Sequence, residues 1–230
     1  MFGLSSQKIL NVPYYAQVSS VHCQSTVMKM YAQYLDRYKF PGRSAGNVEV
    51  QSIWNDINLP GNPDKRADKV RRNAHGNIKQ WLEDRYNPLV LKWTYTSDPE
   101  LGLGLIVQSI DMGYPVIAGV SHERVEGHIV LIVGYIADDL TTRMSNKSDM
   151  QSFDDYSSHR LVVHDPYGAF HPSLKSELYG KNRFVGGKSL SSGGESAPGK
   201  SVELGLYDVS RQRDAKPHTG HGSFNLMAPL

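Results

Sequence analysis

The chain has little of three features that define whole classes of protein. It contains one cysteine in 230 residues, so it has no intramolecular disulfide framework and does not depend on an oxidising compartment. Its formal charge of +2 lacks the strong basic bias of nucleic-acid binders. No segment approaches the roughly 18–20 consecutive apolar residues of a membrane span. Residues 1–10 also lack the apolar core of a signal peptide. We therefore expect no nucleic-acid partner, no membrane span, and either a cytoplasmic location or delivery by a non-classical route.

The order of the elements predicts an α+β fold. Helical patterns come first, and the one that begins at Cys23 carries its apolar side chains on a single stripe. Further helices are expected at residues 67–86 and 97–112. Short apolar runs that are typical of strands follow at residues 88–96, 115–120, 128–136, 160–164 and 202–207. Helices followed by an antiparallel sheet are the pattern of α+β proteins.

The length is compatible with one domain, and we expect residues 1–230 to form it. Two segments have little to bury: a polar stretch at about 138–158, expected to be an insertion, and a Gly/Ser-rich loop at about 186–200. Residues 43–66 are expected to be mostly loop, anchored by Trp54 and Ile57.

The lone thiol of Cys23 is either a small buried hydrophobic group or a nucleophile. A thiol attacks a carbonyl as the thiolate, which is stabilised by a nearby imidazole and by the positive end of a helix dipole. Cys23 begins a predicted helix. His128 begins an apolar strand that could hold an imidazole, and Asp165 ends the next strand, where it could orient that ring. Gln17, six residues before the thiol, could donate to an oxyanion.

Four segments, taken in order, resemble the papain-like cysteine peptidases of the C39-like branch. They are LNVPYYAQ at residues 10–17, GYPVIAGV at 113–120, GHIVLIVGY at 127–135 and VVHDPYG at 162–168, together with the six-residue step from Gln17 to Cys23. A weaker echo at residues 199–213 is similar to cell-wall-associated and phage-encoded members. The resemblance implies a papain-like fold in which the helix that carries the cysteine packs on a C-terminal antiparallel sheet.

The resemblance also implies a role for each candidate residue. Cys23 would be the nucleophile, His128 the general base and then acid, Asp165 the orienting group and Gln17 the oxyanion donor. The sequence departs from the family at one position, where Gln24 replaces the glycine that many members carry after the cysteine.

The third member of the triad is less well defined than the other three residues. The gap between His128 and Asp165 is longer than is usual in the family. Asp138 or Asp139 therefore stays open as an alternative orienting residue.

The histidines raise a metal site as an alternative. His122 and His128 are six residues apart, which suits neither a helix face nor a zinc finger. His164 and Asp165 are adjacent on a predicted strand, so they could serve one site only if a bulge interrupted the alternation of side chains. With no compact ligand pair, we expect neither a metal nor a cofactor.

The expected activity is hydrolysis of a peptide or peptidoglycan-type amide bond by a monomer, with a cell-wall or virion-associated role. Two other functions stay open. An acyltransferase or transglutaminase-like enzyme would use the same residues and would differ in its products when an amine is added. A catalytically inert C39-like module would bind a peptide without cleaving it, and its buried cysteine would react slowly with iodoacetamide.

Overall fold

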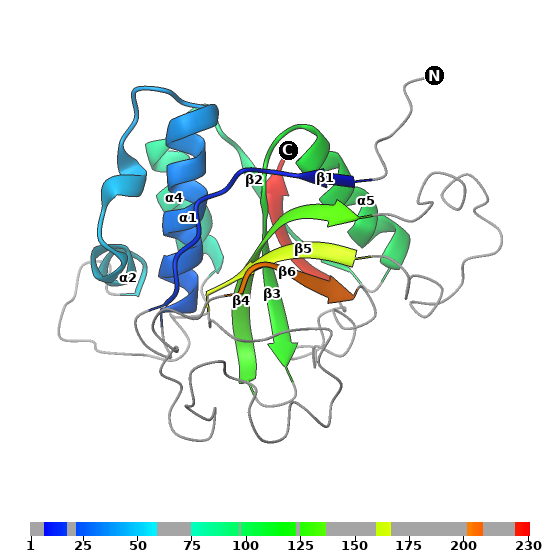
Figure 1. Ribbon diagram of the computed structural model, residues 1–230. Coiled ribbons are helices and arrows are strands. Elements are labelled where there is room, and N and C mark those ends of the chain that lie inside the picture. The colour runs from blue at the N-terminus through cyan, green and yellow to red at the C-terminus, as the bar shows by residue number, and fades with distance from the viewer. Residues whose placement is uncertain are drawn as a thin grey trace.

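The computed structural model describes residues 7–17, 22–58, 75–96, 98–122, 125–136, 160–166, 202–208 and 224–230 (Figure 1). The predicted insertion at 138–158 and the Gly/Ser-rich loop at 186–200 lie outside the described residues. Helices and an antiparallel sheet confirm the α+β class. In the described ranges, no helix is long and apolar enough to span a bilayer.

The central helix, α1, spans Cys23–Tyr38 and begins at the predicted residue. Every residue from Cys23 to Ala32 is buried. A helix that is buried all round must be covered on several sides. Helix α1 contacts the short 3-10 helix Ala45–Asn47, the helices α2 (Val50–Asn58) and α4 (His75–Arg85), and strand β4 (Val125–Ile136). Helix α4 spans His75–Arg85, and its predicted first residues, 67–74, lie outside the described residues.

Helix α2, at Val50–Asn58, shows that the predicted loop over residues 43–66 was wrong in this part. Ile53 and Ile57 lie four residues apart, which places them on one helix face, and both are buried. The helical signal is only two turns long, and the mixed sequence before it concealed it. The predicted anchors, Trp54 and Ile57, belong to this helix.

Helix α5, at Pro99–Asp111, starts and stops as its local sequence predicts. The side chain of Asp98 accepts a hydrogen bond from the N–H of Leu101 at 3.2 Å, which caps the first turn. At the other end Gly113 adopts a positive φ of 78°, and its N–H donates to Ile110 O at 2.9 Å. This is the left-handed turn that commonly ends a helix.

The described strands form one sheet in the order β2-β7-β3-β4-β5-β6, and β1 pairs with the far end of β4. All of these pairings are antiparallel. The strands are β1 Gln7–Ile9, β2 Leu91–Thr96, β3 Val116–His122, β4 Val125–Ile136, β5 Arg160–Asp165, β6 Val202–Asp208 and β7 Phe224–Pro229.

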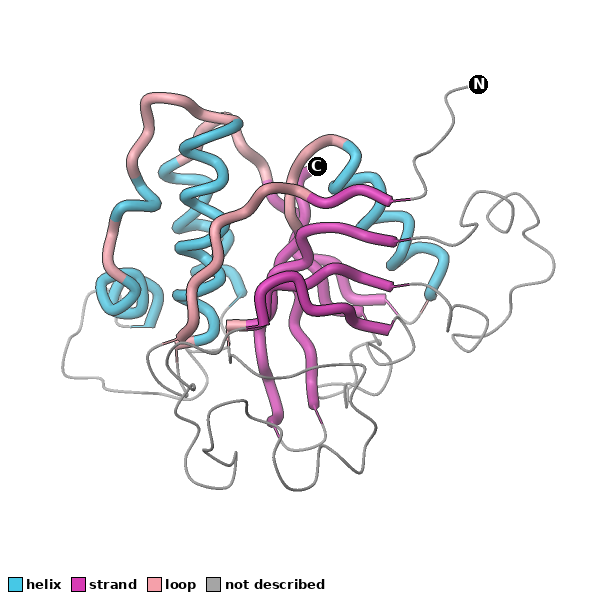
Figure 2. The backbone as a smooth tube through the Cα atoms, in the orientation of Figure 1, coloured by secondary structure: helices cyan, strands magenta, loops and turns pink. Residues whose placement is uncertain are grey.

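Figure 2 shows the strands as one continuous layer, with α1, α2 and α4 on one side and α5 on the other.

Two strands, β1 and β7, were not predicted from the sequence. Strand β7 lies between β2 and β3, and Met227 pairs with both Trp93 and Ile117. Its side chains at Phe224, Leu226 and Met227 are fully buried. This apolar cluster was the signal available in the sequence, but the cluster is short and follows a long polar stretch.

Candidate functional site

Cys23 is the first residue of α1, and its exposed fraction is 8%. Its neighbour His22 fixes the start of the helix against α2: His22 Nε2 lies 3.0 Å from Gln51 Oε1, and its ring lies 5.9 Å from that of Trp54. The His22 carbonyl accepts the N–H of Thr26 at 2.9 Å, which closes the first helical turn. Cys23 therefore lies at the amino end of α1, and this end of a helix carries a partial positive charge.

The N-terminal segment, residues 10–17, leads from β1 towards this helix and contains neither helix nor strand. Leu10 N–H donates to Val133 O at 2.8 Å, which attaches its first residue to β4. His164 Nε2 lies 2.9 Å from Val12 O. A carbonyl oxygen only accepts, so the His164 ring donates from Nε2 in this contact.

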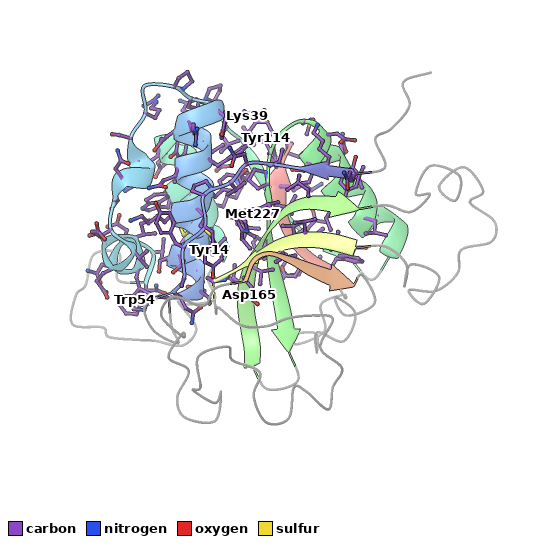
Figure 3. The ribbon with its side chains drawn as sticks, viewed as in Figure 1. Tyr14, Lys39, Trp54, Tyr114, Asp165 and Met227 are labelled. Carbon is purple, nitrogen blue, oxygen red and sulfur yellow. The ribbon has the colours of Figure 1, made fainter. Side chains whose placement is uncertain are left out.

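The other end of the same segment is bonded to Asp165, the last residue of β5, and to Pro166 directly after it. The hydroxyl of Tyr14 donates to the backbone oxygen of Asp165 at 2.7 Å, and the N–H of Gln17 donates to Pro166 O at 2.7 Å. Figure 3 labels Tyr14 and Asp165 at this junction between α1 and β5. The structure therefore brings the backbone of Gln17 and the backbone around Asp165 together.

Both Gln17 and Asp165 are removed from solvent: the exposed fraction of Gln17 is 2% and that of Asp165 is zero. His164 is also fully buried and faces Tyr14, with the two rings edge to face at 5.3 Å and 85°. The pairing of β5 with β6 shifts between Val163 and Asp165. Such a shift in register can let the side chains of His164 and Asp165 depart from pointing to opposite faces of the sheet.

His128 lies on β4, where its backbone pairs with Val120 of β3. Further along the same strand, Leu131 pairs with His164 of β5. Since β5 runs antiparallel to β4, its end at Asp165 lies towards the part of β4 that holds His128. Helix α1 contacts β4 as well. The elements that carry Cys23, His128 and Asp165 are therefore neighbours, whereas Asp138 and Asp139 lie outside the described residues.

Two contacts around the candidate residues were missed from the sequence. The sequence did not show that Tyr14 and His164 attach the N-terminal segment to β5, because each hydrogen bond joins residues more than a hundred positions apart. Only the run of two tyrosines before Gln17 hinted at such an anchor. Tyr15 makes the matching contact on the other side, where its hydroxyl donates to Gln33 Oε1 of α1 at 2.8 Å.

No set of three His, Cys, Asp or Glu residues that could hold a metal ion is found within the part of the chain that the structure describes. Among those residues, the chemistry that the site offers is that of one thiol, buried carboxyl and amide groups, and imidazoles. These are the groups used in covalent acyl transfer by a cysteine.

Comparison with known proteins gives one family and structural likenesses to solved chains. The model of the Peptidase_C39 like family matches residues 9–185. No curated protein sequence matches the chain. A crystal structure of UfSP from C. elegans is similar at 11% sequence identity with a TM-score of 0.43, over 100% of this chain and 35% of that one. The chain thus spans about a third of the length of that protein.

Proposed function

Because the chain belongs to the Peptidase_C39 like family of cysteine peptidases, we propose that it hydrolyses an amide bond with Cys23 as nucleophile. In this proposal His128 is the base, Asp165 orients it, and Gln17 donates to the oxyanion. The observation that carries the proposal is the bonding of the Gln17 backbone to Pro166, directly after Asp165. It holds Gln17 beside the residue that follows Asp165, although Gln17 and Asp165 are far apart in the sequence.

The reaction would proceed through an acyl-enzyme. Cys23 Sγ attacks the substrate carbonyl carbon while His128 takes the thiol proton, and His128 then passes this proton to the leaving amine as the C–N bond breaks. Water, deprotonated by His128, attacks the resulting thioester and releases the acid and the thiol. Both tetrahedral intermediates carry a negative oxygen, which the side-chain amide of Gln17 and the backbone N–H of Cys23 would bind.

The proposed roles of His128 and Asp165 agree with the burial of the carboxyl group. A fully buried carboxylate is stable only when an opposite charge or hydrogen-bond donors compensate for its lost hydration. An imidazolium on the neighbouring strand would supply both. Asp165 would in turn fix the orientation of that ring and stabilise its charge while the proton is held.

For the substrate we propose a peptide or a peptidoglycan-type amide. The support is the likeness of the sequence at residues 199–213 to cell-wall-associated and phage-encoded members. The same resemblance at residues 199–213 also favours a cell-wall or virion-associated role.

The test is the substitution Cys23→Ala. The protein would be incubated with a mixed peptide library and, separately, with purified peptidoglycan, and the products would be identified by mass spectrometry. We expect cleavage to disappear in the variant, with an unchanged circular dichroism spectrum. Cleavage that persists in Cys23→Ala would contradict the proposal.

Ser25→Ala is the matched control. It also removes a side-chain group from the first turn of α1, but the Ser25 hydroxyl donates to the His22 carbonyl at 3.2 Å and has no role in the proposed reaction. This variant should keep full activity. An added primary amine distinguishes hydrolysis from acyl transfer: a hydrolase releases the acid, whereas a transferase yields the new amide.

A further inference from the structure

We infer that Tyr14 and His164 are positioning residues, which hold the N-terminal segment on the end of β5 so that Gln17 reaches the reacting carbonyl oxygen. This inference rests on the proposed function and deepens it. Neither residue would touch the reacting atoms. They would affect the reaction only by fixing the position of Gln17.

The bonds from the segment are made to three consecutive residues, the last two of β5 and Pro166 directly after it. His164 uses its ring to bind Val12 O at 2.9 Å. Asp165 and Pro166 use their backbone oxygens to accept from Tyr14 Oη and Gln17 N, each at 2.7 Å. The segment and the strand end thus run alongside each other without forming a ladder, and side chains supply two of the three bonds.

The other side of the segment is attached to α1. Tyr15 donates to Gln33 Oε1, and the ammonium group of Lys29 lies 5.0 Å from the centre of the Tyr15 ring. Tyr14 and Tyr15 are consecutive, so one binds the sheet and the next binds the helix that begins at Cys23. The segment is therefore held between the element that carries the nucleophile and the strand that ends in Asp165.

Such attachment matters because the segment has no regular structure of its own. Pro13 has no N–H, so it cannot contribute a backbone donor between Val12 and Tyr14. An oxyanion donor must lie within hydrogen-bond distance of an oxygen that is charged only during the reaction, and small displacements weaken it greatly. The hydroxyl of Tyr14 is the nearest side-chain anchor before Gln17 that reaches β5.

Two covalent probes separate this positioning from the reactivity of the thiol. Iodoacetamide alkylates Cys23 Sγ by displacing iodide, and no oxyanion forms. N-Acetylglycinal, a minimal peptide aldehyde, adds the thiol across its C=O group, with the thiol proton moving to the oxygen, and gives a hemithioacetal. Only the second product places an oxygen where Gln17 would donate.

We expect Tyr14→Phe to weaken hemithioacetal formation by about tenfold or more, while alkylation by iodoacetamide stays within about twofold. Tyr34→Phe is the matched control, because its hydroxyl also donates to a backbone oxygen, that of Gly113 at 2.9 Å, but at the other end of α1. The control should change neither reaction. The His164→Phe variant, which lacks the Nε2 donor, should follow Tyr14→Phe.

Hydrogen–deuterium exchange gives a second readout that needs no probe. Exchange in residues 10–17 should be faster in Tyr14→Phe than in the wild type and unchanged in Tyr34→Phe. Equal exchange, or equal aldehyde affinity in Tyr14→Phe and the wild type, would overturn the inference alone. Absence of a Cys23 adduct in the wild type would instead contradict the proposed function, and the inference with it.

Discussion

At the scale of single residues, Glu83 of α4 shows how one charged group joins a helix to the sheet. Both of its carboxylate oxygens lie 2.6 Å from Lys79 Nζ, and Oε1 accepts the N–H of Leu91, the first residue of β2, at 2.7 Å. Burial by itself raises the pKa of Glu83. The bonds from Lys79 and Leu91, with the Lys79 charge, outweigh burial and hold that pKa below 4.5. The carboxylate form therefore stabilises the folded chain.

A pKa that is lower in the folded than in the unfolded chain gives stability that is present above the unfolded value and is lost as the pH falls through the folded value. We expect Glu83→Gln to lower the free energy of unfolding at pH 7 by on the order of 1 kcal/mol. The variant and the wild type should converge as the pH falls through the lowered pKa of Glu83 in the folded chain. Urea unfolding at pH 7, 5 and 3 measures this.

Glu49→Gln is the control, since its carboxylate lies 3.9 Å from Lys29 and its side chain is 83% exposed. Glu49→Gln should leave the free energy of unfolding nearly unchanged at each pH. A Glu83→Gln deficit that stays constant from pH 7 to pH 3 would contradict the assigned role of the charge.

At the scale of elements, helix α5 contains two glycines with different surroundings. A Cβ atom at Gly102 would overlap the ring of Phe224, the first residue of β7, whose side chain is fully buried. A Cβ atom at Gly104 would meet nothing within 4 Å. The same residue type thus allows close packing on β7 at one position and only adds backbone freedom at the other.

Gly104→Ala is expected to raise the free energy of unfolding by about 0.5–1 kcal/mol, because alanine loses less backbone entropy in a helix. Gly102→Ala is expected to lower it by about 1–3 kcal/mol, because the buried ring has no room to move. Chemical denaturation of the two variants gives the comparison. Equal shifts in the same direction would show that helix propensity alone decides both positions.

At the scale of the whole molecule, the last strand completes the sheet. Strand β7 pairs with β2 over its whole length and with β3 at Met227 and Leu226. Without it, β2 would lose its described partner strand, and β3 would keep only β4. The sheet is therefore continuous only when the end of the chain is folded back into it.

Deletion of residues 224–230 is expected to abolish cooperative thermal unfolding, because it exposes the edges of two strands and empties the core of three fully buried side chains. Scanning calorimetry and tryptophan fluorescence would show this. Deletion of Leu230 alone is the control, since this residue is 76% exposed and contributes one N–H bond to Val90 O. A cooperative transition in the longer deletion at the wild-type temperature would refute the closing role of β7.

The sequence by itself determined the elements whose signals are local. The stripe of apolar residues from Cys23 predicted α1, and Asp98 with Gly113 predicted both ends of α5, because caps and periodicity act within a few residues. The four candidate residues were instead identified by their residue types, their order along the chain and the resemblance to the C39-like family. Their roles at Cys23, His128, Asp165 and Gln17 stay predictions.

Tertiary structure alone decided which distant segments meet. Strand β7 was not predicted because it pairs with Trp93 and Ile117, which lie more than a hundred residues away. A short apolar run does not indicate which distant strand it will pair with. For the same reason the sequence could place Gln17 before the thiol but could not show that Tyr14 binds Asp165. Hydrogen bonds depend on distance in space, and only the folded chain brings the N-terminal segment to the end of β5.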